Sequence, residues 1–194
     1  MNSLKLRAPK RGVDWPSFQQ EWKDCSRCQI GVWAHKHVLG SGPLDAKIVF
    51  IGEGPGQSEN TLGLPFIGRA GRLLRKAIKS AGGDPDACAY TNVVACRPCD
   101  TQLGGNRPPK EEEAKNCAPR LTQFLSMYQD LRVLVLCGKV PEAYLLAPLI
   151  RVTTAKQWVG CIPHPAHIAR QGGVNSQLWQ RYVDSIRGAL GRTK

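Results

Sequence analysis

Five of the eight cysteines are spaced as metal ligands often are. Two pairs have the Cys-x-x-Cys spacing, Cys25 with Cys28 and Cys96 with Cys99, and Cys117 follows the second pair. Four thiolates can bind zinc, and they can also bind an iron–sulfur cluster. Spacing alone leaves open whether the two pairs hold zinc or whether Cys25, Cys28, Cys96 and Cys117 hold a [4Fe–4S] cluster.

Four short runs rich in valine and isoleucine predict the elements that would position such residues. They indicate buried strands at residues 47–51, 90–95, 132–137 and 157–162. Helical patterns lie around them, at residues 14–24, 69–81, 110–129, 140–146 and 176–190. Strands that alternate with helices favour a parallel sheet covered on both faces. We therefore expect an α/β fold, a three-layer α/β/α sandwich around a short parallel β-sheet.

Three of these strands lead directly into loops that could carry chemistry. The first is followed by the glycine loop 52–56, the second by residues 96–98 and the fourth by residues 163–167. Ligands of parallel sheets bind beyond the carboxyl ends of the strands, so the three loops should meet at one rim. The glycine loop lacks the G-x-G-x-x-G spacing and the later acidic residue of a dinucleotide site, which excludes that function.

The charge of the chain points to a polyanionic partner. Lysine and arginine outnumber aspartate and glutamate by 27 to 15, a formal net charge of +12. Cationic surfaces release counterions from phosphate backbones, so this excess favours nucleic acid. No secretory signal or membrane-spanning run occurs, and we expect a cytoplasmic protein with reduced cysteines. Residues 1–13 suggest a basic flexible arm, and residues 14–194 one catalytic domain.

Four motifs occur in order along the chain: GEGPG at 52–56, GLPFIGRAG at 63–71, TNVVACRP at 91–98 and HPA at 164–166. Together they resemble the signature of family 4 uracil-DNA glycosylases, and the match runs from about Cys25 to Arg170. The resemblance implies DNA repair by an enzyme that extrudes uracil from DNA and hydrolyses its N-glycosidic bond. It also implies a monomer whose partner is uracil-containing DNA.

The same resemblance implies a [4Fe–4S] cluster with four cysteine ligands, Cys25, Cys28, Cys96 and Cys117, while Cys99 is left unbound. The cluster would clamp the N-terminal segment to the region after the second strand. Residues 100–105 make the interval between the last two ligands longer than the family usually has.

Three side chains are expected to form the uracil pocket. By resemblance, Phe66 would stack on the extruded base, as aromatic rings do on nucleobases. The amide of Asn92 would accept from N3–H and donate to O4, a pairing that distinguishes uracil from cytosine. His164 would donate a hydrogen bond to O2 as negative charge develops there.

A carboxylate is expected to orient water or to stabilise the sugar cation. Glu53 is the first candidate for this catalytic role, and Glu59 is a second carboxylate that could also exclude the methyl group of thymine. Gly54 and Gly56 would let the backbone approach the base closely.

Residues 167–171 are expected to enter the gap that the extruded nucleotide leaves. Ile168 would act as an apolar wedge between bases, and Arg170 would contact phosphate. Two other functions remain as alternatives: a non-catalytic relative that binds uracil or abasic DNA, and a zinc-clamped nuclease or interaction module.

Overall fold

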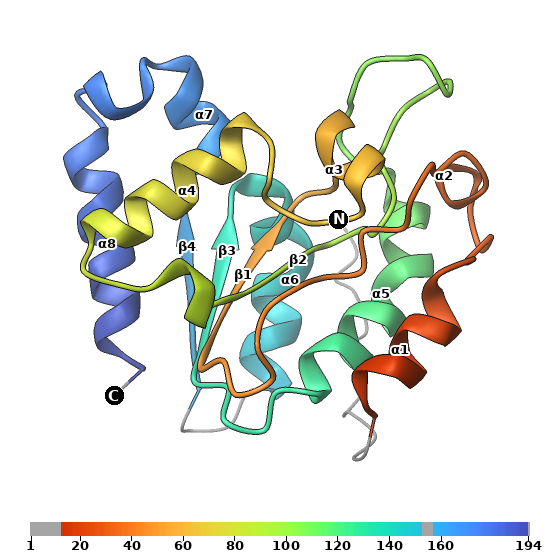
Figure 1. Ribbon diagram of the computed structural model, residues 1–194, viewed down its shortest axis with the longest axis horizontal. Helices are drawn as coiled ribbons and strands as arrows, with labels where there is room; N and C mark the ends of the chain where they lie inside the picture. The colour runs from red at the N-terminus through yellow and green to blue at the C-terminus, as the bar shows by residue number, and fades with distance from the viewer. Residues whose placement is uncertain (1–12, 153–156, 194) are drawn as a thin grey trace.

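The computed structural model describes residues 13–152 and 157–193, so most of the expected N-terminal arm lies outside the described residues. A four-stranded sheet forms the centre of the molecule (Figure 1). Its strands are β1 (Ile48–Gly52), β2 (Ala89–Asn92), β3 (Val133–Cys137) and β4 (Trp158–Ile162). The helices are α1 (Trp15–Trp22), α2 (Gln29–Val32), α3 (Gln57–Leu62), α4 (Arg69–Ser80), α5 (Glu111–Ser126), α6 (Lys139–Val152), α7 (Pro165–Arg170) and α8 (Trp179–Gly191), with short 3-10 helices at Pro85–Ala87 and Gly173–Asn175.

All pairings in the sheet are parallel, and the strand order is β2-β1-β3-β4. The chain moves outward from β1 to β2 and then returns to the other side of β1 to form β3. This reversal is the topological switch point at which ligands of open parallel sheets bind. The carboxyl ends of β1 and β2 are level, because Gly52 pairs with Asn92. The predicted α/β class and parallel sheet are confirmed.

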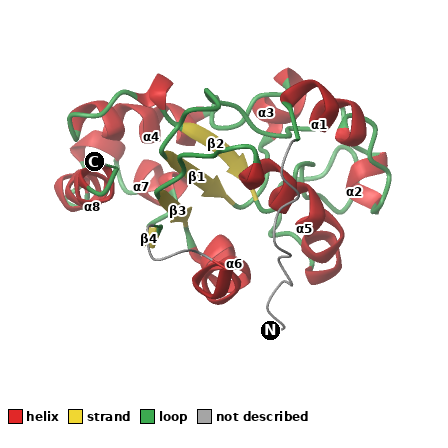
Figure 2. Cartoon of the chain, turned by 90° about the horizontal axis from the view of Figure 1, so that it is seen from below, coloured by secondary structure: helices red, strands yellow, loops and turns green. Residues whose placement is uncertain are grey.

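Helices cover both faces of the sheet, as Figures 1 and 2 show. Alternate residues of β1 point to opposite layers. Ile48 and Phe50 pack in the core beneath α4 and α8, whereas Val49 and Ile51 pack in the core with α5 and α6. Burial on both faces explains why β1 and β3 appear in the sequence as continuous apolar runs, whereas the edge strand β4 is only partly buried.

Helix boundaries follow local chemistry in most places. Asp14 caps α1, since its side chain accepts a hydrogen bond from the Ser17 N–H at 2.8 Å. Helix α6 was expected to stop before Pro148, but it continues to Val152. Proline lacks the N–H for one helical bond, and burial of Leu145 and Leu149 on both sides of it compensates for that loss.

Three short helices, α2, α3 and α7, were not predicted. Each has four to six residues, too few for a clear helical period in the sequence. In the described ranges, no helix is both long and apolar enough to cross a membrane.

Candidate active site

The ends of β1 and β2 bring two of the expected recognition residues together. A Cβ atom on Gly52 would overlap the amide oxygen of Asn92 and would lie 2.8 Å from Cζ of Phe66. The amide and the aromatic ring therefore meet over the backbone of residue 52, and both side chains are largely buried. Sequence reasoning assigned roles to Gly54 and Gly56 but missed Gly52, although it is the first glycine of the same motif.

The Asn92 amide retains its hydrogen-bonding capacity for a ligand. Residues 13–152 and 157–193 offer it no hydrogen-bond partner in this structure, while its backbone carbonyl accepts a 2.5 Å bond from Arg120. A fixed backbone with a free amide is the arrangement expected of a side chain that recognises the edge of a base.

The loop that carries Phe66 is held in a strained conformation. Phe66 has φ = 54°, in the left-handed region that non-glycine residues rarely adopt, at a cost of roughly 1–3 kcal/mol. Oε1 of Glu59 accepts hydrogen bonds from Ile67 N–H at 3.1 Å and Gly68 N–H at 2.7 Å. A Cβ atom on Gly71 would overlap the Phe66 backbone. Glu59 and Gly71 thus hold the ring in place, and any direct contact of Glu59 with substrate stays a prediction.

Glu53 lies on the glycine loop just beyond β1 and is partly buried. Burial raises the pKa of its carboxyl group, because the charged form is poorly solvated there. Within the described part of the chain its side chain has no hydrogen-bond or ion-pair partner. A carboxylate of raised pKa without a structural partner can serve as a general base or stabilise a cation.

His164 begins α7, and its tautomer follows from one hydrogen bond. Nδ1 accepts from the Ala166 N–H at 3.1 Å, which places the proton of the neutral ring on Nε2. Burial, with a smaller contribution from the charge of Arg170, lowers the pKa of His164 to about 4. Gly138, at the end of β3, makes room for this residue, since a Cβ atom there would lie 2.8 Å from that of His164.

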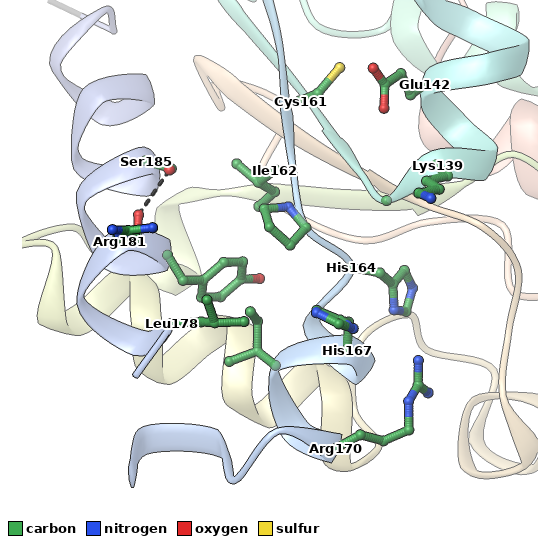
Figure 3. Close-up of a pocket in the computed structure, with 14 residues that line it drawn as sticks. Lys139, Glu142, Cys161, Ile162, His164, His167, Arg170, Leu178, Arg181 and Ser185 are labelled. Carbon is green, nitrogen blue, oxygen red and sulfur yellow. Dashed lines mark hydrogen bonds between the residues drawn. The ribbon is translucent and has the colours of Figure 1, made fainter. Parts of the chain in front are cut away.

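A groove of about 710 Å³ opens beside His164 at the free edge of β4 (Figure 3). Three cations line it, Lys139 from α6, Arg170 from α7 and Arg181 from α8, and they outnumber the one lining carboxylate, Glu142. In the close-up, the guanidinium of Arg170 extends toward the imidazole of His164. A groove with this charge suits a phosphate backbone next to the pocket.

The prediction that Ile168 acts as the wedge is wrong. Ile168 is fully buried in the core beneath α4 and α8, where it packs with residues such as Leu74 and Ile186. Residues 165–170 form α7, and the apolar side of this short helix turns inward while His167 and Arg170 remain exposed. Exposed apolar side chains near the rim include Leu103, which is 100% exposed.

The loop that carries Leu103 is braced by two arginines. Arg97 donates to Asn106 Oδ1 at 2.6 Å and to the Gly104 carbonyl at 2.5 Å. Arg107 forms ion pairs with Asp100 at 2.8 Å and Glu113 at 2.7 Å. In Figure 1 this loop extends outward next to α3, where Asn106 approaches Gly56. These bonds give the loop a defined shape at the rim.

Four cysteines from distant parts of the sequence line one small cavity. Cys25 and Cys28 lie between α1 and α2, Cys96 follows β2, and Cys117 lies within α5. The Ala95 N–H points to Sγ of Cys117 at 3.4 Å. Burial, and then the proximity of the other thiols, raises the pKa values of Cys28 and Cys96.

Cys99 lies apart from this set. It does not line the cavity, and its thiol donates to the Arg97 carbonyl at 3.5 Å. The structure therefore gathers the four cysteines expected to act together and separates the fifth. Over the ranges that the structure describes, however, no group of three or more His, Cys, Asp or Glu side chains is arranged to hold a metal ion, so what the structure shows of the four thiols is a shared cavity and not a closed metal site.

Known proteins resemble this chain in sequence and in fold. Residues 39–187 match the model of the uracil DNA glycosylase superfamily. A type-4 uracil-DNA glycosylase of Thermotoga maritima is 31% identical over 157 residues, which are 76% of this chain and 79% of that protein. The type-4 enzyme of Pyrobaculum aerophilum is 35% identical over 124 residues, 64% of this chain and 61% of that one.

The type-4 enzyme of Sulfurisphaera tokodaii is 33% identical over 133 residues, 68% of this chain. The matched part spans 58% of that relative, less than two thirds of its length. The crystal structure of wild-type SMUG2 from Pedobacter heparinus has a TM-score of 0.57 at 13% identity and covers 76% of this chain and 75% of that chain. This likeness confirms the fold.

Proposed function

Because the chain belongs to the type-4 uracil-DNA glycosylases of the uracil DNA glycosylase superfamily, we propose that it removes uracil from DNA by hydrolysing the N-glycosidic bond. The observation that carries the proposal is the meeting of the Asn92 amide and the Phe66 ring over Gly52, on the rim that also bears a neutral His164.

Recognition requires the base to leave the duplex, because a stacked base presents neither its face nor its full edge. In the extruded state the uracil ring stacks on Phe66. The amide of Asn92 accepts a hydrogen bond from N3–H and donates one to O4. Cytosine has the opposite donor and acceptor pattern at these two positions and would leave the amide unsatisfied.

Cleavage leaves negative charge on the departing uracil and positive charge on the sugar. Nε2–H of His164 donates to O2 and stabilises the anion, which suits a ring that is neutral at physiological pH. Glu53 acts on the opposite charge: its carboxylate orients the attacking water or stabilises the sugar cation. Gly54 and Gly56 keep this side of the pocket open to the base.

The DNA strand follows the groove beside the pocket. Lys139, Arg170 and Arg181 line that groove and bind phosphates on one side of the extruded nucleotide. Leu103, at the tip of the braced loop, is the apolar side chain that contacts the duplex in place of the buried Ile168.

The four cysteines that share a cavity fit a [4Fe–4S] cluster in their number and in their donor atoms. Cys25, Cys28, Cys96 and Cys117 would be its ligands. When bound, the cluster supplies a covalent cross-link between three segments far apart in sequence. These cysteines thereby hold the N-terminal segment and α5 against the end of β2, where Asn92 lies.

The experiment that tests this function uses a labelled oligonucleotide with one uracil, single-stranded or paired, at low salt. Wild type, Asn92→Ala and His164→Ala are compared, and alkali cuts any abasic site. We expect an alkali-labile product from the wild type and its loss in both variants. His35→Ala is the matched control, because His35 is exposed and does not line the groove beside His164, and it should keep activity. Tight uracil-dependent binding without product, from iron-loaded protein, would instead indicate the non-catalytic binding function.

A further inference from the structure

A buried arginine lies between the cysteine cavity and the base-recognition residue. Arg120 belongs to α5, and its side chain has an exposed fraction of 0%, which makes it one of the largest fully buried side chains. Burial of an ionised group is strongly unfavourable unless nearby groups compensate its charge and its hydrogen bonds. The environment of this guanidinium therefore needs a physical explanation.

The hydrogen-bond partners of Arg120 are neutral. Nη1 donates to the Leu39 carbonyl at 3.1 Å and to Thr91 Oγ1 at 2.6 Å. Nη2 donates to the carbonyls of Asn92 at 2.5 Å and Val93 at 3.1 Å. Nε is buried and has no partner among the described residues. These acceptors solvate the guanidinium, but none of them carries a charge.

Among residues 13–152 and 157–193, no carboxylate forms an ion pair with Arg120. Glu113 lines the same cavity, but its two oxygens bind Arg107 at 2.7 and 2.8 Å. One of them also accepts from the Lys110 N–H at 2.7 Å. The charge of Glu113 is already compensated by Arg107, so the charge of Arg120 needs a different partner.

The cysteines that line the same cavity could provide the negative charge that Arg120 needs. Arg120 follows Cys117 by three residues in α5, so both side chains lie on one side of the helix. Arg120 also lines the cavity with Cys25, Cys28 and Cys96. A cluster bound through four thiolates carries net negative charge, and a cation beside it would be compensated even without a carboxylate.

We propose that Arg120 is the buried counter-charge of the cysteine-bound cluster and ties it to the strand end that carries Asn92. The inference rests on the proposed iron–sulfur cofactor. It makes Arg120 a positioning residue: the guanidinium is anchored on one side by the cluster's charge and on the other holds the Asn92 and Val93 carbonyls. Cluster retention and uracil recognition therefore depend on the same side chain.

The test compares iron-loaded wild type with Arg120→Gln, Arg120→Lys and Thr91→Val. The first variant removes the charge, and the second keeps it without the planar fork. Thr91→Val is the matched control, because it deletes one acceptor of Arg120 and leaves the charge in place. Iron content, the decay of the cluster's visible absorbance under a chelator, and far-ultraviolet circular dichroism are measured on each protein.

We expect Arg120→Gln to lose the cluster roughly 100-fold faster than wild type, because a buried charge loses its partner. Arg120→Lys and Thr91→Val should lose it within about tenfold of the wild-type rate. Cluster loss from Arg120→Gln at the wild-type rate would overturn the proposal. Equal rates for the Lys and Gln variants would also overturn it, since hydrogen-bond geometry would then matter and charge would not.

Three further outcomes keep the test decisive. If Arg120→Gln does not accumulate as folded protein, the Arg120→Lys variant decides. The proposal requires this variant to keep the cluster and to bind uracil-containing DNA more weakly than wild type. Loss of the cluster from Arg120→Lys would contradict the proposal. Wild-type protein without iron would refute the proposed cofactor. Iron-loaded wild type with an unaffected Gln variant would refute only the role of Arg120.

Discussion

The backbone N–H of Ala166 donates a hydrogen bond to Nδ1 of His164 at 3.1 Å, so the single proton of the neutral imidazole lies on Nε2. Two independent features support the neutral ring: this donor at Nδ1 and the burial that lowers the pKa to about 4. A protonated ring would lose the Ala166 hydrogen bond, because both of its nitrogens are donors.

Replacement of His164 by alanine should lower kcat on the order of 10²–10³-fold with little change in KM. The donor at Nε2 acts on charge that develops only as the bond breaks, which is the usual effect of removing one such donor. Single-turnover kinetics on uracil-containing DNA measure this. His35→Ala, an exposed change outside the groove, should stay within about threefold of wild type. Equal losses in both variants would contradict the role of His164.

The pH dependence of activity should report Glu53 and not His164. Burial raises the pKa of Glu53 above its usual 4.5, whereas that of His164 is lowered to about 4. As pH falls, the Glu53 carboxylate is protonated first, so the acid limb of kcat/KM should lie above pH 4.5. Glu53→Gln should lower the plateau and remove this limb. An acid limb that persists in the variant would assign it to another group.

His164 should make the folded protein less stable as the pH falls, because its pKa is lower in the fold than in the unfolded chain. Its pKa is 6.5 in the unfolded chain and about 4 in the fold, so the unfolded state binds more protons between these values. The free energy of unfolding should therefore decrease as pH falls from about 6.5 to about 4. In His164→Ala this part of the decrease should be absent, which urea denaturation at several pH values can measure.

Much of the fold was predictable because its physical causes are local. Strands β1 and β3 are buried on both faces, so each appears as an apolar run, and the strand predicted at residues 132–137 matches β3 within one residue. The rim also followed from general rules, since parallel strands place their following loops together. The grouping of the four cysteines needed the family resemblance, because spacing alone left zinc and an iron–sulfur cluster equally open.

The failures concern contacts that only the folded chain creates. Ile168 was expected at the surface, but its burial depends on which side of α7 faces α4 and α8. The importance of Gly52 arises from the close approach of Asn92 and Phe66. Arg120 lies in an ordinary helical segment of the sequence, and only tertiary packing shows that its charge is buried.

A methyl group at Gly52 should damage uracil recognition without affecting the cysteine cavity. Gly52→Ala would push against the Asn92 amide and the Phe66 ring. We expect at least about a tenfold loss in kcat/KM, since a misplaced amide loses a specific pairing, with wild-type iron content. Gly188→Ala is the control: its Cβ would meet nothing within 4 Å in α8, and it should stabilise the protein by roughly 1 kcal/mol. Unchanged activity in Gly52→Ala would argue against this pocket.

Leu103 should matter for duplex DNA more than for single strands. It is 100% exposed on a loop braced by Arg97 and Arg107, and an apolar wedge is useful only where bases must be unstacked. Leu103→Ala should reduce kcat/KM on paired uracil about tenfold and leave single-stranded cleavage near wild type. Leu44→Ala is the control, because Leu44 is also exposed but precedes β1, at the opposite end of the sheet. Equal losses on both substrates would refute the wedge.

The groove beside His164 should account for part of the salt dependence of DNA binding. Lys139 and Arg170 line it, and each phosphate contact contributes about 0.9 to the slope of log K against log salt concentration. Arg170→Gln and Lys139→Gln should each lower the magnitude of this slope by about 1, as fluorescence anisotropy can measure over a salt series. Lys47→Gln, an exposed change at the start of β1, should not alter it. A slope unchanged in both groove variants, with wild-type cleavage, would place the DNA backbone elsewhere. A reduced slope would place the DNA strand in the groove next to His164.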